Sequence, residues 1–297
     1  MLFSGKVNQE EVWGFFASAD YFDDEASYPS NERDMLYVAL PESDEEITSI
    51  KSTMVHEYQH LLHFVIHNYI PWLNGADPDY NPTWLDEAFA HLSEEITGFG
   101  VDNVSFVHDI LQVFSAYSLA FGEDELEDRA FGFLFMLYLF EQHGGFEYGT
   151  NKTIEDMGGP SFLKAVIASE SSGFDALAEG AEWSVSELFF DWLVTLVVDN
   201  RGLTTDSRYT YADIFIDPVT GYEIGVITNG GRTDSYGNAY TFTGPMRTPL
   251  DANPLAGNVT ATSAMFYSLH GYAGDMPVTV THTGDTIGLG LIRISAE

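Results

Sequence analysis

The pattern of hydrophobic and polar positions changes near residue 205. Before this point, long stretches place apolar residues every three or four positions, which is typical of amphipathic helices. After it, short alternating stretches rich in Thr, Gly and Val are typical of strands. The pattern predicts an α+β chain, with a mostly helical domain over residues 1–205 that includes a small preceding sheet, and a β-rich, sandwich-like accessory domain over residues 206–297.

The first long helix has a clear start. A strand is predicted over residues 34–40, and Pro41 ends it. Ser43, with Glu46 three residues later, forms a capping box. Apolar residues then follow at helical spacing, at Ile47, Ile50, Met54, Leu61 and Val65. A second helix is predicted from Thr83 to Gly98, and the prolines and glycines between the two predict a loop.

Further elements follow from the same periodicities. Helices are predicted at 102–117, 124–143, 161–169 and 185–199. Strands separated by turns are predicted within 213–227, 238–244, 260–269, 276–284 and 288–295, the pattern of a sheet or sandwich.

Composition is that of a folded protein without membrane spans. The chain has 297 residues, of which 45% are hydrophobic and 14% aromatic, enough for a packed core. Its longest apolar runs, 131–140 and 188–198, are too short to cross a bilayer, which takes about 20 residues. No basic and apolar segment of the signal-peptide type opens the chain, so such a peptide is expected to be missing or already removed.

The charge balance is strongly acidic. There are 46 Asp and Glu residues against 11 Lys and Arg, a formal net charge of −35. Such a surface repels nucleic acids and anionic membranes, and it favours solubility in a salty medium, as in a halophilic protein. Calcium binding at residues 20–25 or 77–81 is an alternative interpretation of the acidic clusters, although neither stretch has EF-hand spacing.

Histidines are the main candidates for metal ligands. The chain has no cysteine, so any metal ligand must be His, Asp or Glu. His56, Glu57 and His60 form an HExxH pattern inside the first long helix. Residues four apart share a helix face, so both imidazoles can bind one ion, with Glu57 beside a metal-bound water. The alternative is a pair of ordinary core or solvated histidines.

A catalytic zinc site needs a third protein ligand. Glu87, in "PTWLDEAFAHLSEE" on the second predicted helix, is the best candidate, and His91 faces the same way. Glu87 can alternatively be a helix-end acid favoured by the helix dipole. Asp86 lies about 100° around the helix from Glu87 and is expected to point away from the ion.

These residues resemble a known group of enzymes. "HEYQH" followed by "WLDEAFA" is similar to the gluzincin metallopeptidases, the clan of thermolysin, and most of all to the hyicolysin family. "SNERDMLYV", "FGFLFMLYLFEQHGG" and "LFFDWLVTLVVDN" extend the resemblance over residues 20–200. It implies a thermolysin-like catalytic domain in which His56, His60 and Glu87 bind Zn²⁺ and Glu57 is the general base. The 26 residues between His60 and Glu87 depart from thermolysin-like spacing, and His91 stands where an acid would be.

Two functions from different classes follow. The first is a secreted or cell-surface, monomeric zinc endopeptidase that acts on proteins or peptides. The second is a non-catalytic or degenerate peptidase-like acidic binding module. The donor that stabilises the oxyanion of a peptidase is not placed by the sequence, and the candidates are Tyr138, His143, Tyr209 and Tyr211.

Overall fold

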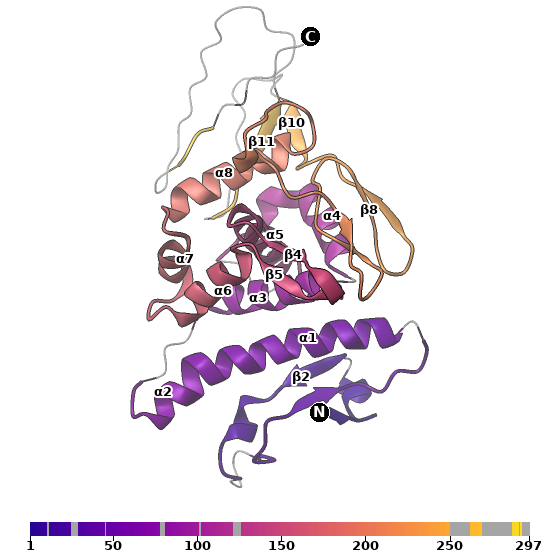
Figure 1. The fold of residues 1–297 in the computed structure, drawn as a ribbon, viewed down its shortest axis with the longest axis vertical. Helices are drawn as coiled ribbons and strands as arrows, with labels where there is room; N and C mark the ends of the chain where they lie inside the picture. Colours follow the sequence, from indigo (N-terminus) through magenta and orange to yellow (C-terminus); the bar gives the residue numbers. More distant parts are fainter. Residues whose placement is uncertain are drawn as a thin grey trace, which may run out of the picture.

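The longest helix, α1 (Glu46–Phe64), lies between a small N-terminal sheet and the other helices (Figure 1). The computed structural model describes residues 1–10, 12–24, 29–44, 46–77, 81–100, 102–120, 126–249, 262–268, 287–290 and 292. Helices predominate and the sheets are small, so the predicted α+β, mostly helical class is confirmed.

The N-terminal sheet has the strand order β1-β3-β2. β2 (Gly14–Phe16) is an edge strand that pairs antiparallel with β3 (Leu36–Val38), and β1 (Leu2–Phe3) pairs parallel with β3 on the other side. Leu36 and Val38 pack against Ile50 of α1 in a small apolar cluster. A Cβ atom at Gly14 would lie 2.8 Å from Thr53 Cγ2, so only glycine lets β2 approach α1 this closely.

α1 begins as predicted but the helical path continues further. Ser43 Oγ accepts a hydrogen bond from Glu46 N at 3.3 Å, half of the expected capping box. A π-helical turn, η3 (Val65–Tyr69), and a short helix, α2 (Ile70–Leu73), then carry the chain past Pro71, where a loop was expected. The loop prediction was wrong there, because Pro71 stands at the start of α2, where a missing N–H is tolerated.

The main core forms around α5 (Leu126–Gln142), whose residues 130–140, apart from Gly132, are buried apolar side chains of one cluster. α3 (Thr83–Ile96) packs on both α1 and α5. The other helices are α4 (Asn103–Val113), α6 (Gly159–Ala168), α7 (Gly173–Ala181) and α8 (Val185–Val198). Of these four, only α7 was not predicted, since it is short and carries two glycines. Short 3₁₀ turns lie at Val7–Glu10, Ser18–Tyr21, Phe114–Ala116, Thr150–Lys152 and Ser207–Tyr209.

In the described part of the chain after residue 205, strands pair two by two. The antiparallel pairs are β6 (Phe215–Ile216) with β7 (Glu223–Ile224) and β8 (Gly231–Thr233) with β9 (Ala239–Thr241). β10 (Arg247–Pro249) pairs parallel with β11 (Phe266–Ser268), and before residue 205 β4 (Phe146–Tyr148) pairs with β5 (Ile154–Asp156). The strand predicted at 276–284 lies outside the described residues.

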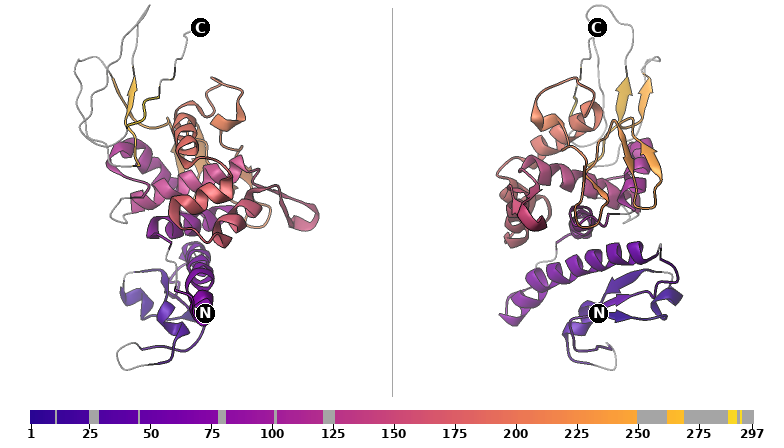
Figure 2. Two further views of the ribbon diagram at one scale, coloured as in Figure 1. Left: turned by 90° about the vertical axis from the view of Figure 1, so that its left-hand side faces the viewer. Right: turned by 45° about the vertical axis from the view of Figure 1, so that its right-hand side comes forward.

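The strands after residue 205 pack beside the helices on one side of α1, while the N-terminal sheet lies on the other side (Figure 1 and Figure 2). Tyr211, Val226 and Phe242 belong to the same apolar cluster as α3 and α5. A buried ion pair adds a polar link, because Arg232 Nη1 lies 2.8 Å from Glu95 Oε1 of α3. Arg232 also donates to the carbonyls of Gly225 and Glu223, at 2.7 Å each. Residues 223–232 are therefore anchored to the helix that carries Glu87.

No helix among the described residues combines the length and the apolar character that a membrane crossing requires. The expectation of no membrane-spanning helix is therefore confirmed for this part of the chain.

The buried pair predicts a large effect of one substitution. Arg232→Met leaves the carboxylate of Glu95 buried without its counter-ion, and we expect a loss of about 3–5 kcal/mol in the free energy of unfolding. Urea denaturation at fixed salt measures it. Arg208→Met is the control, because Arg208 is exposed and pairs with Asp206 at the surface, where ion pairs contribute little. Equal urea midpoints for both variants would contradict the anchoring role of Arg232.

Candidate metal centre

The contact between α1 and α3 brings His56, His60 and Glu87 together. His56 Nε2 lies 3.3 Å from Glu87 Oε2, and His60 Nε2 lies 3.6 Å from Glu87 Oε1. One ligand atom from each of the three residues lies within 4.8 Å of the others. The two rings come from successive turns of α1, with their centroids 4.7 Å apart, as the spacing of four residues predicts.

Both imidazoles are held by carboxylates on their other nitrogen. His56 Nδ1 donates to Glu94 Oε1 at 2.6 Å, and His60 Nδ1 donates to Asp86 Oδ2 at 2.9 Å. A proton fixed on Nδ1 leaves Nε2 as the nitrogen that faces Glu87. Metal-binding histidines in proteins are oriented in this way, by an acceptor behind the ligand.

Glu94 is buried and accepts several hydrogen bonds. Besides His56, Ser52 Oγ donates to it at 2.9 Å, and His91 Nδ1 lies 3.3 Å away while also contacting Asn103 Oδ1 at 2.9 Å. Burial alone would raise the pKa of the Glu94 carboxyl, but the positive charges of His91 and His56 and their hydrogen bonds lower it to about 2. Glu94 is thus an ionised anchor for His56. His56, His91 and Glu94 also form a possible ligand group, but Nδ1 of His56 is already bound to Glu94.

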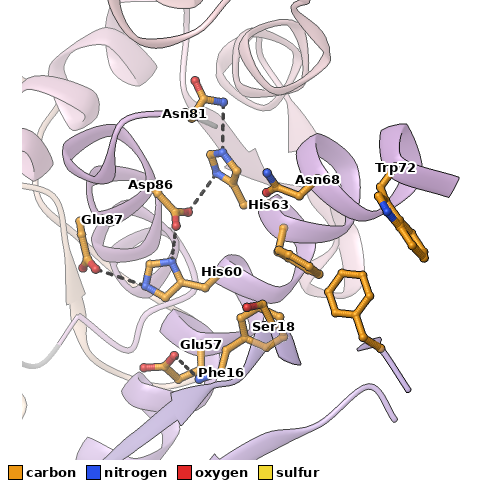
Figure 3. Close-up of a pocket in the computed structure, with 12 residues that line it drawn as sticks. Phe16, Ser18, Glu57, His60, His63, Asn68, Trp72, Asn81, Asp86 and Glu87 are labelled. Atoms are coloured by element: carbon orange, nitrogen blue, oxygen red, sulfur yellow. Dashed lines mark hydrogen bonds and ion pairs between the residues drawn. The ribbon is translucent and has the colours of Figure 1, made fainter. Parts of the chain in front are cut away.

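Asp86 does not behave as the sequence suggested. It was expected to point away from the ion, yet it contacts His60 Nδ1 at 2.9 Å, on the other side of the ring that Glu87 contacts, and it also lies 3.0 Å from His63 Nδ1. Nε2 of His63 accepts from Asn81 Nδ2 at 3.1 Å (Figure 3). A chain of contacts therefore runs from His60 through Asp86 and His63 to Asn81. A substitution of Asp86 would disturb His60, so it is not a suitable control for a substitution of Glu87. Sequence reasoning missed it because periodicity does not show contacts between helices.

Glu87 lies inside the protein, between the two histidines and an arginine. Its side chain is buried, and its Oε2 lies 3.0 Å from Nη1 of Arg129 on α5. Burial raises the pKa of the Glu87 carboxyl, but the hydrogen bond from His56 and the charges of His60, His56 and Arg129 lower it overall. Its environment differs from that of an exposed acid at a helix end. The sequence pattern did not predict that Arg129 lies at this site.

Glu57 borders a cavity of about 530 Å³ together with His60 and Glu87 (Figure 3). The backbone N–H of Phe16, on β2, donates to Glu57 Oε2 at 2.9 Å. The edge strand thus fixes the carboxylate beside the candidate ligands. The cavity continues away from Glu87 along η3 and α2 to Trp72.

The two imidazoles hold protons strongly. Burial alone would lower the pKa of His56, but the hydrogen bonds and charges of Glu87 and Glu94 raise it to about 10. The pKa of His60 is also raised, because Asp86 and Glu87 outweigh the effects of burial and of His56. A cation at Nε2 must therefore displace a proton from each ring.

The donor set fits a zinc ion. Zinc binds imidazole nitrogen and carboxylate oxygen at about 2.0–2.2 Å in tetrahedral geometry, which places ligand atoms about 3.3–3.6 Å from one another. His56 Nε2 lies 3.3 Å from Glu87 Oε2 and His60 Nε2 lies 3.6 Å from Glu87 Oε1, and one ligand atom from each residue lies within 4.8 Å of the others, so a small adjustment of the side chains would suffice to hold the ion. The identity of the metal follows from this chemistry as a proposal.

The residues considered as oxyanion donors lie elsewhere. Tyr138 Oη donates to the carbonyl of Arg208 at 3.0 Å, and Tyr211 Oη donates to that of Leu134 at 3.0 Å. His143 stacks on Phe162. None of these three, nor Tyr209, is among the described residues that line the cavity.

The acidic stretches considered for calcium lie partly outside the described residues. Within them, Asp20 is buried and accepts hydrogen bonds from the N–H of Asn31 and the hydroxyl of Tyr37. Calcium binding stays a prediction.

No family model matches the chain, and no curated protein is significantly similar to it.

Competition between zinc and protons can be measured. Because the pKa values of His56 and His60 are raised, zinc affinity should rise with pH, by up to about tenfold per unit for each proton displaced. Titration calorimetry in buffers of different ionisation enthalpy counts the protons released. His60→Ala should release fewer, while His108→Ala, which changes an exposed histidine paired with Asp109, should match the wild type. An affinity independent of pH would show that the imidazoles are not ligands.

Proposed function

We propose that this protein is a zinc-dependent endopeptidase. The observation that carries the proposal is the convergence of His56 Nε2, His60 Nε2 and the Glu87 carboxylate, each imidazole held from behind by a carboxylate, at the end of a cavity that Glu57 also lines. A bound zinc ion polarises a carbonyl and lowers the pKa of its water ligand. His56, His60 and Glu87 would hold the ion, and three protein ligands are the number typical of catalytic zinc sites.

Glu57 is the general base in this proposal. Its carboxylate takes the proton of the attacking water and returns it to the departing amine, a role that requires a carboxylate fixed next to the site. The hydrogen bond from the N–H of Phe16 supplies that fixation. Asp86 and Glu94 keep the two imidazoles in one orientation and in one tautomer.

The neighbouring sheet supports a peptide as the substrate. β2 is at the edge of its sheet, and Phe16 and Ser18 at its end line the cavity. An extended peptide could pair with the backbone groups of such an edge that remain free, since the N–H of Phe16 already binds Glu57. An edge strand beside an open cavity suits cleavage within a chain, which favours an endopeptidase.

The thermolysin-like fold and the sandwich-like accessory region after residue 205 are part of the same proposal. The HExxH helix, the second helix with Glu87 and the preceding small sheet support the first. The net charge of −35 supports a secreted or cell-surface enzyme in a salty medium.

Substituting the general base should separate binding from catalysis. Glu57→Gln keeps the three ligands but cannot accept the proton, so we expect about one zinc per chain and a loss of turnover of at least about 100-fold. Metal analysis and hydrolysis of an unfolded protein measure the two effects. Turnover equal to that of the wild type would remove Glu57 from the mechanism.

Substituting the third ligand should affect the metal as well. Glu87→Ala leaves zinc with two protein ligands, and we expect zinc and activity to be lost together. Glu187→Ala is a matched control, because Glu187 is an exposed acid in the first turn of α8. Zinc retained by Glu87→Ala would show that Glu87 is not the third ligand. A wild-type chain that binds no zinc and cleaves nothing would instead favour the non-catalytic binding module.

A further inference from the structure

The cavity beside the metal centre ends in an aromatic wall. Phe16 and Phe22 come from the N-terminal segment, Phe64 from the end of α1 and Trp72 from α2. These rings contact one another: the centroids of Phe22 and Trp72 are 5.1 Å apart, and those of Phe16 and Phe64 are 5.6 Å apart. Tyr21 and Tyr69 pack behind them.

The wall is only partly covered by the rest of the described chain. Trp72 is 50% exposed and Phe22 is 37% exposed, although large aromatic side chains are mostly buried in proteins. At about 530 Å³ the cavity lies within the usual range of binding sites for small molecules and side chains, about 300–1,000 Å³. Exposed rings at the mouth of a cavity that also holds candidate catalytic residues provide a surface for an apolar group.

Among the described residues that line this cavity, the acidic side chains lie at one end. Glu57, Asp86 and Glu87 lie at the end next to the histidines, whereas Trp72 lies at the opposite end (Figure 3). Among the described lining residues, those near Trp72 are aromatic or amide side chains. A ring bound there would be desolvated without burying a charge.

Asn68 adds a specific polar group. It lies on η3, lines the cavity and is 9% exposed, and its Nδ2 is buried with no hydrogen-bond partner among the described residues. A buried donor without an acceptor costs free energy, and rotation of the terminal amide about its soft χ2 torsion would bring this donor to an acceptor bound in the cavity. The phenolic oxygen of a tyrosine is such an acceptor on an aromatic ring.

We propose that this aromatic pocket binds an aromatic side chain of the peptide substrate, and that Asn68 makes the pocket prefer tyrosine to phenylalanine. This inference depends on the proposed peptidase function and names its substrate class. The wall supplies the affinity for the ring, and the amide of Asn68 donates to the phenolic oxygen.

Peptides that differ at one residue test the pocket. For the zinc-loaded wild type we expect kcat/KM to fall from tyrosine to phenylalanine to alanine, with at least about tenfold between tyrosine and alanine. Trp72→Ala should reduce the ratio of aromatic to alanine peptides several-fold. Trp183→Ala, which changes a tryptophan equally exposed at 50% and outside this cavity, should leave both ratio and activity unchanged.

Asn68→Leu separates the two parts of the proposal. It should abolish the preference for tyrosine over phenylalanine and keep the preference for aromatic residues over alanine. Cleavage with equal rates for tyrosine and alanine peptides, or a preference for lysine, would overturn the pocket while leaving the peptidase function intact. Phenylalanine cleaved as fast as tyrosine by the wild type would overturn the role of Asn68.

Binding distinguishes failure of the pocket from failure of the enzyme. Zinc-loaded Glu57→Gln allows calorimetry with intact peptides, and tyrosine peptides should bind at least several-fold more tightly than alanine peptides. If the wild type cleaves no peptide but tyrosine peptides still bind more tightly than alanine peptides, the pocket is supported and the peptidase function is refuted. Equal affinities would overturn the pocket whatever the activity.

Discussion

The packing of α1 on α3 places ionisable side chains in the interior, and the rest of the site depends on how their charges are compensated. His56, His60, Asp86, Glu87 and Glu94 all come from these two helices. Desolvation opposes the charge on every one of them. The charges persist because each carboxylate faces at least one imidazole. A third helix contributes Arg129, so α1, α3 and α5 must keep one arrangement for the balance to hold.

The sequence predicted most of the helices, including the two that carry His56, His60 and Glu87. The capping box at Ser43 and the periodicity that follows predicted the helix of His56 and His60, because these are local signals within one element. The position of Glu87 followed from the next helix in the same way. The approach of Glu87 to the two imidazoles is a contact between helices, which the sequence could suggest only through their adjacency and the resemblance to gluzincins.

The remaining contacts join residues far apart in the chain. Arg129 reaches Glu87 across more than forty residues, and Arg232 reaches Glu95 across more than a hundred. Phe16, which binds Glu57, belongs to a strand at the start of the chain. No periodicity carries such information. Pro71 led to a wrong prediction for a different reason. A proline usually ends a helix, so a loop was predicted, but here Pro71 follows a π-helical turn and lies at the start of α2.

That π-helical turn determines which way the later residues point. A π turn holds one residue more than an α turn, and each residue advances the side chains about 100° around an α-helix. Removing one residue from Val65–Tyr69 would rotate everything after it by about that angle, and would also bring Pro71 into a helix interior, where its ring clashes with the preceding turn. Trp72 would then leave the cavity, while His56 and His60, which precede the turn, would stay in place. The extra residue thus sets the aromatic end of the cavity independently of the candidate metal ligands, so the insertion or deletion of one residue could change that end while His56 and His60 keep their positions.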